Sequence, residues 1–242
     1  MKRAVIIVAG GSGLRMGTDI PKQFLPLKGI PVLIHTILAF RRVIPDSEVV
    51  LVLPKSHQSF WHKMYNDTIS QLGGDSNLLN HLLMADGGNS RFASVKNGLA
   101  KLVHLADYDL VAVHDGVRPL VSAEVINRCF QIAEQKKAVV PVIPVVDSLR
   151  KLTTNSSSMN QTTIINKSKS VARAEYVSVQ TPQVFGMSVL RHAYLQDFNS
   201  HFTDDASVVE ADGFEVSLVL GNDENIKLTT RKDMCLAEQL IQ

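Results

Sequence analysis

The chain has 242 residues, of which 45% are hydrophobic, and a formal net charge of +2. This length and apolar content suit one large α/β domain with a sizeable core. The near-neutral charge, without a basic run, is not typical of a nucleic-acid-binding protein. The apolar stretches are too short or too interrupted by proline to cross a membrane, and the first one ends without a signal-peptide cleavage site, so we expect a cytoplasmic protein with no membrane partner.

The two cysteines, Cys129 and Cys235, are far apart in the sequence, and no Cys/His cluster surrounds either of them. This pattern indicates free thiols of a cytosolic protein. It favours neither a disulfide framework nor a Cys/His metal site.

The N-terminal segment predicts a buried strand followed by a phosphate-binding loop. Residues 4–9 form a short, uncharged, β-branched run, which ends at residues 10–13 (GGSG). Glycine lets the backbone turn sharply and approach a ligand, and its N–H groups can form an anion-binding concavity. Arg15 and Lys22 then add cations that can neutralise a polyphosphate. The alternative interpretation is a glycine turn that serves only tight packing, with two solvated cations.

Two well-known phosphate loops do not fit this segment. A P-loop requires Gly-Lys-Ser/Thr, which does not occur in the sequence. The dinucleotide fingerprint G-x-G-x-x-G fails because Met16 stands at its third glycine, and no acidic residue follows about 20 positions later. The loop therefore belongs to another class of phosphate site.

Strands and helices alternate along the next hundred residues. Apolar runs predict strands at residues 48–53, 81–84, 109–114 and 138–146. Amphipathic spacing and capping residues predict helices at residues 31–42, 55–71 and 92–104 and after Ser122. Since βαβ crossovers produce parallel strands, a mostly parallel sheet is expected, with the loops that follow Ala9, Met84 and His114 along one rim.

The segment from Asp147 to about Val179 differs in composition from the rest of the chain, because it is polar and poor in aromatic residues. A disordered linker is one interpretation. We favour a hairpin arm with short strand pieces at residues 162–165 and 171–172, because a long structureless loop within a compact domain is uncommon. An arm this polar cannot bury a core of its own, so we expect it to pack on a second copy of the chain.

The C-terminal part returns to mixed structure. We expect a helix at residues 188–195, a second helix capped by Thr203 or Asp204, and a strand at residues 215–220. Thr230 and Asp233 resemble a capping box for the last helix.

Several short motifs, taken in order, resemble those of the 2-C-methyl-D-erythritol 4-phosphate cytidylyltransferase family. They are residues 9–17 with Pro21-Lys22-Gln23, Asp86-Gly87-Gly88, Arg91–Ser94, Asp115–Pro119, Thr181-Pro182-Gln183, residues 203–207 (TDDAS) and Asn225-Ile226-Lys227. The resemblance runs from Ala4 to near the C-terminus.

The resemblance implies a Rossmann-like nucleotidyltransferase fold over residues 1–242, similar to that of GT-A glycosyltransferases, with a dimerisation arm at about residues 148–178. The implied reaction transfers CMP from CTP to the polyol phosphate and releases pyrophosphate. Mg²⁺ is the implied cofactor, held mainly by the CTP phosphates near Asp115 and not by a metal site of the protein.

The resemblance also assigns roles to individual residues. The implied catalytic residues are Arg15, Lys22 and Lys227. The implied nucleotide-binding residues are Ala9, Gly10, Gly11, Gly13, Gly88, Asn89, Ser94 and Asp115. The implied substrate-binding residues are Asp115, Arg118, Ser148, Arg173, Thr181 and Thr203, with Ser148 and Arg173 reaching the substrate of the other subunit.

Three positions depart from the family pattern, and other interpretations stay open. Gly10 stands where many family members have alanine. Asn89 stands where an acidic residue is frequent, and Ser148 stands where threonine is usual. Ribitol-5-phosphate cytidylyltransferases share the Ala-Gly-Gly start and are the alternative. A GT-A glycosyltransferase normally has Asp-x-Asp, which Asp115-Gly116-Val117 lacks, and a non-catalytic nucleotide-binding module has no need for converging cations. Single residues also have structural interpretations: a turn cap for Asp115, a surface pair with Glu175 for Arg173, and strand packing for His114.

Overall fold

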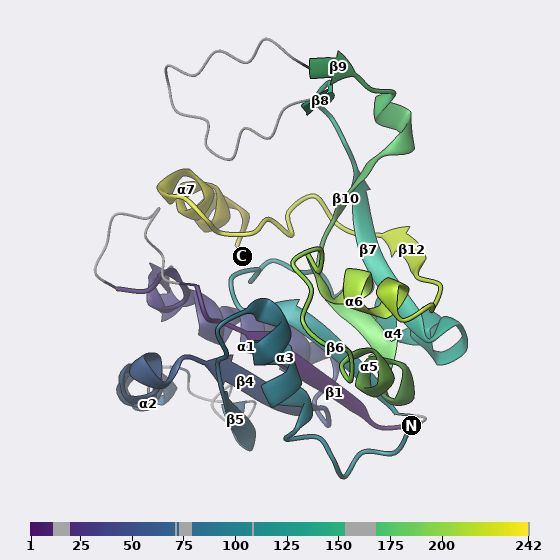
Figure 1. The fold of residues 1–242 in the computed structure, drawn as a ribbon. Helices are drawn as coiled ribbons and strands as arrows, with labels where there is room; N and C mark the ends of the chain where they lie inside the picture. The colour runs from purple at the N-terminus through teal and green to yellow at the C-terminus, as the bar shows by residue number, and fades with distance from the viewer. Residues whose placement is uncertain (12–19, 71, 73–78, 108, 153–167, 242) are drawn as a thin grey trace.

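A mostly parallel sheet forms the centre of the molecule (Figure 1). The computed structural model describes residues 1–11, 20–70, 72, 79–107, 109–152 and 168–241. The eight-stranded sheet contains β1 (Arg3–Val8), β4 (Glu48–Leu53), β5 (Leu82–Asp86), β6 (Leu110–Asp115), β7 (Ala138–Pro144), β10 (Val177–Val179), β11 (Gln183–Gly186) and β12 (Ser217–Leu220). Only β10 and β11 pair antiparallel with their neighbours. The predicted α/β class with a mostly parallel sheet is confirmed.

Six helices described in the structure cover the two faces of this sheet: α1 (Val32–Val43), α2 (Lys55–Ile69), α3 (Arg91–Leu99), α4 (Ala123–Lys136), α5 (Met187–Ala193) and α6 (Asp205–Ala211). The last helix, α7 (Arg231–Leu240), lies apart from the sheet and packs near Leu27 (Figure 1). Side chains of β1 alternate between two cores: Val5 and Ile7 pack with α1, α2 and α4, whereas Ala4 and Ile6 pack with α3, α5 and α6. This alternation explains why the strand has no polar face.

The strand order places a ligand crevice at the carboxyl end of β1. The sheet runs β5-β4-β1-β6 on this side, and β1 pairs parallel with both β4 and β6. The chain passes from β1 outward to β4 and β5 and then crosses back to β6 on the other side of β1, so the strand order reverses beside β1. A ligand crevice forms at such a switch point in open α/β sheets.

Several predicted elements shift by a few residues. The third strand runs to Asp86, two residues beyond its predicted end, and α3 ends at Leu99 instead of His104. After Leu99 the chain turns so that Leu102 and Leu105 enter the core. The predicted caps Ser122 and Thr230 are confirmed, and Asp204, not Thr203, caps α6.

A two-stranded stem projects from the sheet between β7 and β10 (Figure 1). Its strands, β8 (Arg150–Leu152) and β9 (Ser168–Ser170), pair antiparallel. The hairpin interpretation is therefore confirmed at the stem, but the strand piece predicted at Val171–Ala172 is wrong, because the chain there leads into a 3-10 turn at Arg173–Glu175. The other predicted piece, residues 162–165, lies outside the described residues.

A short hairpin of β2 (Pro26–Leu27) and β3 (Ile30–Pro31) precedes α1. Among the residues that the structure describes, no helix is long and apolar enough to cross a membrane.

The two cysteines differ in exposure. Cys129 is buried and Cys235 is exposed, and both are free thiols.

Candidate active site

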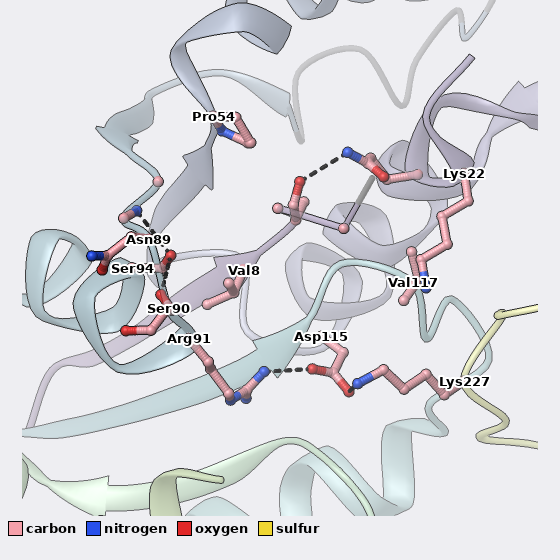
Figure 2. A pocket seen from close by; sticks show the side chains of 16 residues that line it. Val8, Lys22, Pro54, Asn89, Ser90, Arg91, Ser94, Asp115, Val117 and Lys227 are labelled. Atoms are coloured by element: carbon pink, nitrogen blue, oxygen red, sulfur yellow. Dashed lines mark hydrogen bonds and ion pairs between the residues drawn. The ribbon is translucent and has the colours of Figure 1, made fainter. Parts of the chain in front are cut away.

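A cavity of about 410 Å³ opens at the carboxyl ends of β1, β4, β5 and β6. The loops after these strands supply most of its lining, which is drawn in Figure 2. The predicted rim is therefore confirmed. Its polar side chains come from segments as distant in the sequence as Lys22 and Lys227.

The turn between β5 and α3 closes one side of this cavity. The Ser94 hydroxyl accepts a hydrogen bond from the Gly88 N–H at 3.0 Å and donates one to the Ser90 carbonyl at 2.8 Å. A Cβ atom on Gly88 would lie 2.4 Å from the Ala93 Cβ, so this position requires glycine. The close approach presents backbone, not side chain, to a ligand.

The end of β1 forms the floor beside it. The buried Gln23 side chain donates to the Ala9 carbonyl at 2.9 Å, which ties β1 to the 3-10 turn Lys22–Phe24. Lys22 lies against Gly11, where an added Cβ would come within 3.2 Å of the Lys22 Cε. Lys22 thus lines the cavity, whereas Gly13 and Arg15 lie outside the described residues.

Asp115, the last residue of β6, is the centre of a charged cluster. Its Oδ1 accepts from Arg91 Nη1 at 2.7 Å. Its Oδ2 accepts from Arg118 Nε at 3.1 Å and from Lys227 Nζ at 3.1 Å. Figure 2 shows Arg91 and Lys227 approaching the carboxylate from opposite sides. Burial would raise the pKa of Asp115, but Arg91, Lys227 and Arg118 together hold it well below its usual range, so the carboxylate stays ionised.

A second cavity of about 310 Å³ adjoins the first. Both cavities are lined by Arg91, Asp115 and Lys227, which we call the shared wall. The second cavity is also lined by Arg118, Val179, Gln180, Thr181, Gln183, Thr203 and Asp204. The structure therefore brings the predicted residues Arg118, Thr181 and Thr203 together on the far side of this wall.

A buried hydrogen-bond chain fixes the loop after β6. The Asp115 N–H donates to Thr181 Oγ1 at 3.1 Å, and Thr181 Oγ1 lies 3.0 Å from His114 Nδ1. His114 Nε2 lies 3.1 Å from the Arg118 carbonyl, which can only accept, so Nε2 carries the proton and Nδ1 accepts from Thr181. Burial lowers the pKa of His114 to about 3, so the ring is neutral. The packed interpretation of His114 agrees with this geometry.

Lys227 is held by its apolar neighbours. Ile226 and Leu228 pack with α7 and with Leu27 from β2, and the Leu228 N–H donates to the Val117 carbonyl at 2.9 Å. The C-terminal segment thereby brings Lys227 to a cavity built mainly from the N-terminal half.

Two predicted residues lie away from both cavities. Ser148 and Arg173 are exposed on the arm, and Arg173 donates to the Val146 carbonyl. Neither lines the first or the second cavity.

Sequence reasoning missed the role of Arg91 and its partner Asp205. Arg91 was visible only as part of a motif, and Asp205 as an acid in the first turn of a helix. Arg91 Nη2 and Asp205 Oδ2 lie 2.7 Å apart. A contact across 114 positions leaves no local signal in the sequence.

A glycine turn and two lysines around one cavity suit a nucleotide polyphosphate, and a second polar cavity beside it suits a second substrate, as a nucleotidyltransferase requires. The similarity to known proteins identifies this class and the particular family. A family model described as 2-C-methyl-D-erythritol 4-phosphate cytidylyltransferase matches residues 3–242, and the chain belongs to this family.

Individual members of the family match this chain over nearly their full lengths. The chain is 52% identical to the enzyme of that name from Bacteroides thetaiotaomicron, covering all of both chains, and 48% identical to that from Porphyromonas gingivalis, covering 99% of this chain and 98% of the relative. The crystal structure of the Francisella tularensis enzyme matches with a TM-score of 0.77 at 26% identity over all of both chains. The Thermus thermophilus structure matches with a TM-score of 0.70 at 30% identity, over 99% of this chain and 98% of that one.

Proposed function

We propose that this protein transfers the CMP group of CTP to 2-C-methyl-D-erythritol 4-phosphate, forming 4-diphosphocytidyl-2-C-methyl-D-erythritol and pyrophosphate, a step of non-mevalonate isoprenoid precursor synthesis. One observation carries the proposal: two polar cavities meet at a wall of Arg91, Asp115 and Lys227. Such a wall can hold two phosphate-bearing substrates side by side, and the family membership identifies them.

The first cavity is the proposed nucleotide site. The flat cytosine would lie against the backbone of the β5–α3 turn and of the loop after β1. The residues assigned to the nucleotide are Ala9, Gly10, Gly11, Gly13, Gly88, Asn89, Ser94 and Asp115. Asn89 can hydrogen-bond to the base but carries no charge. Lys22, with Arg15 from the same loop, would hold the triphosphate.

The second cavity is the proposed site of the polyol phosphate. Arg118 would bind it with the Nη2 end of its guanidinium, since Nε and Nη1 already donate to Asp115 and to the Asn225 carbonyl. Thr203 offers an exposed hydroxyl to the polyol. The Thr181 hydroxyl donates to His114, so it would receive a substrate hydroxyl as an acceptor.

The chemistry requires alignment and charge neutralisation more than a protein nucleophile. A phosphate oxygen of the polyol phosphate attacks the α-phosphorus of CTP. A new P–O bond forms as the bond to the β-phosphate oxygen breaks, and pyrophosphate leaves with that electron pair. Lys227 at the shared wall would face the attacking phosphate and the α-phosphoryl group, while Lys22 and Arg15 would stabilise the leaving pyrophosphate.

We propose Mg²⁺ as the cofactor. Its ligands would come mainly from the triphosphate, because hard cations prefer phosphate and carboxylate oxygens. Within the described part of the chain, no group of three His, Cys, Asp or Glu side chains could hold a metal. Asp115 is the carboxylate that lines both cavities, but three cations already occupy its oxygens. Chelation should therefore abolish turnover and leave the circular dichroism spectrum and the melting temperature unchanged.

We also propose a homodimer joined through the arm, in which Ser148 and Arg173 of one subunit reach the substrate of the other. The exposure of both side chains, away from their own cavities, supports this arrangement. A cytoplasmic location is proposed as well, on the ground that both cysteines are free thiols.

Pyrophosphate release from CTP and Mg²⁺ tests the proposed reaction, with methylerythritol 4-phosphate and ribitol 5-phosphate assayed in parallel. We expect turnover with methylerythritol 4-phosphate only. Turnover with ribitol 5-phosphate alone would move the protein to the alternative substrate, and no release with either would refute the proposed reaction.

A further inference from the structure

Asp205 is a buried carboxylate whose two oxygens both have partners. It lies in the first turn of α6 and has no exposed surface. Its Oδ2 accepts from Arg91 Nη2 at 2.7 Å and from Arg91 Nε at 3.3 Å. Its Oδ1 accepts from the Tyr194 hydroxyl at 2.7 Å.

Helix capping does not account for this residue. Asp204 already caps α6, because its Oδ1 accepts from the Ser207 N–H at 2.9 Å. Burying a second carboxylate beside it is costly unless the charge is paired. The pairing partner is Arg91, and the position of Asp205 is therefore explained by Arg91.

Arg91 transmits this contact to the shared wall. Its guanidinium is planar, so the two nitrogens that donate to Asp205 fix the plane of the group and the direction of the third. The third, Nη1, donates to Asp115 Oδ1 at 2.7 Å. The Asp115 carboxylate is thus turned so that Oδ2 faces Lys227 and Arg118.

The order of charges, with Arg91 between the carboxylates of Asp205 and Asp115, also supports an effect of Asp205 on Asp115. Burial would lower the pKa of Arg91, but Asp205 and Asp115 raise it well above its usual range. Without Asp205, Arg91 would keep Asp115 as its one carboxylate partner among the ion pairs described. Arg91 would then no longer be held in place and could shift toward the Asp115 oxygen that Arg118 and Lys227 share.

We propose that Asp205 is a positioning residue for the transfer reaction, acting through Arg91 to orient Asp115 and so place Lys227 at the shared wall. The proposal rests on the function proposed above. Asp205 lines neither cavity, so it acts without touching a substrate.

Asp205→Asn is the variant that tests it. The amide can still accept from Arg91 through its oxygen and donate to the Tyr194 hydroxyl through its nitrogen, so the substitution removes the charge and keeps the shape. We expect kcat to fall about ten-fold or more, and KM for CTP to change by less than about two-fold, since the turn proposed to hold the cytosine is fixed by Ser90 and Ser94 and not by Asp205.

A double-mutant cycle with Arg91→Gln separates positioning from general damage. If Asp205 acts through Arg91, adding Asp205→Asn to Arg91→Gln changes kcat by less than about two-fold. Ser122→Ala is the matched control, because it removes the side-chain cap of α4 without touching Asp205 or either cavity. We expect it to lower the melting temperature and keep kcat.

Multiplicative losses in the cycle, or unchanged kcat in Asp205→Asn, would overturn the proposal. A crystal structure of Asp205→Asn gives a readout without turnover: Lys227 Nζ should leave hydrogen-bond distance of Asp115, and an unchanged contact would contradict the proposal. If the wild-type protein itself released no pyrophosphate, the proposed reaction would fail, and the crystal structure would still decide whether Asp205 orients Asp115.

Discussion

Asp115 brings together cations from three separate segments: Arg91 from α3, Arg118 from the loop after β6, and Lys227 from the loop before α7. A buried carboxylate is costly on its own, and three donors keep it ionised. The carboxylate in turn orders cations that would otherwise repel one another. Asp115 therefore acts first as an organiser of the shared wall, whatever contact it makes with a substrate.

The role of Lys22 leads to a prediction at the same scale. Lys22→Ala should lower kcat by about 10²-fold or more, the usual scale for losing a donor to transition-state charge. Lys136→Ala, at an exposed position at the end of α4, is the matched control and should keep full activity. A fully active Lys22→Ala enzyme would refute the assigned role.

The buried imidazole of His114 predicts a specific loss of stability in acid. Its pKa is about 3 in the folded protein and about 6.5 when unfolded. Below pH 6.5 the unfolded state binds a proton that the folded state does not, so stability is lost as the pH falls from 6.5 toward 3. The slope from this residue is about 1.4 kcal/mol per pH unit.

Urea unfolding of the wild type and His114→Gln between pH 7 and 4 measures this slope. The glutamine amide can still donate to the Arg118 carbonyl but does not titrate. The unfolding free energy of the variant should fall less steeply with decreasing pH than that of the wild type. The difference in slope should correspond to nearly one bound proton. Identical slopes would show that His114 titrates normally.

At the scale of elements, α7 supports the active site through its packing. Leu228 is buried among residues of β2, α1 and α7, directly after Lys227. Leu228→Ala should lower the free energy of unfolding by about 2–5 kcal/mol. It should also reduce kcat, because the cavity loosens the segment that carries Lys227.

Leu102→Ala provides the comparison. Leu102 is equally buried, but it packs in the core on the α3 and α5 side of the sheet. We expect a similar loss of stability, measured by chemical denaturation, with kcat retained at a temperature where both variants are folded. Equal losses of kcat in the two variants would mean that α7 has no special role.

The elements themselves were largely predictable, because strands buried on both faces are short apolar runs and helices have capping residues. β1, β4 and β6 are of this kind. The arm was harder, since its pairing ends after one further hydrogen bond, from the Val171 N–H to the Leu149 carbonyl at 3.4 Å, and the chain then turns at Arg173–Glu175. Pairing with a distant partner, not local propensity, decides such segments.

At the scale of the whole molecule, the proposed dimer can be tested by subunit complementation. Lys22→Ala and Arg173→Ala each disable one part of the site. If Arg173 acts on the partner's substrate, a mixed dimer contains one site with both residues intact. Co-refolding equal amounts should then restore about a quarter of wild-type activity, whereas an Arg173 that acts within its own chain would give no recovery.

Much of the candidate site could be predicted from the expected parallel sheet. Loops after parallel strands meet at one edge, so the loop after β1, Gly88 and Asp115 were expected together, and the structure places them there. Lys22 was expected from its place shortly after the glycine loop, whereas Lys227 needed the family resemblance, because a lone lysine has no signal of its own. The Arg91–Asp205 pair could not be predicted, since only the folded chain brings α3 and α6 together.

The central claim is that each cavity takes one substrate and that the two meet at the shared wall. Steady-state KM values for both substrates, measured for Ser94→Ala and Arg118→Met, test it most directly. Ser94 lines only the first cavity and Arg118 only the second. We predict that Ser94→Ala raises KM for CTP alone and that Arg118→Met raises KM for the polyol phosphate alone. If either variant raised both KM values together, or raised the opposite one, the assignment of the two cavities would be wrong.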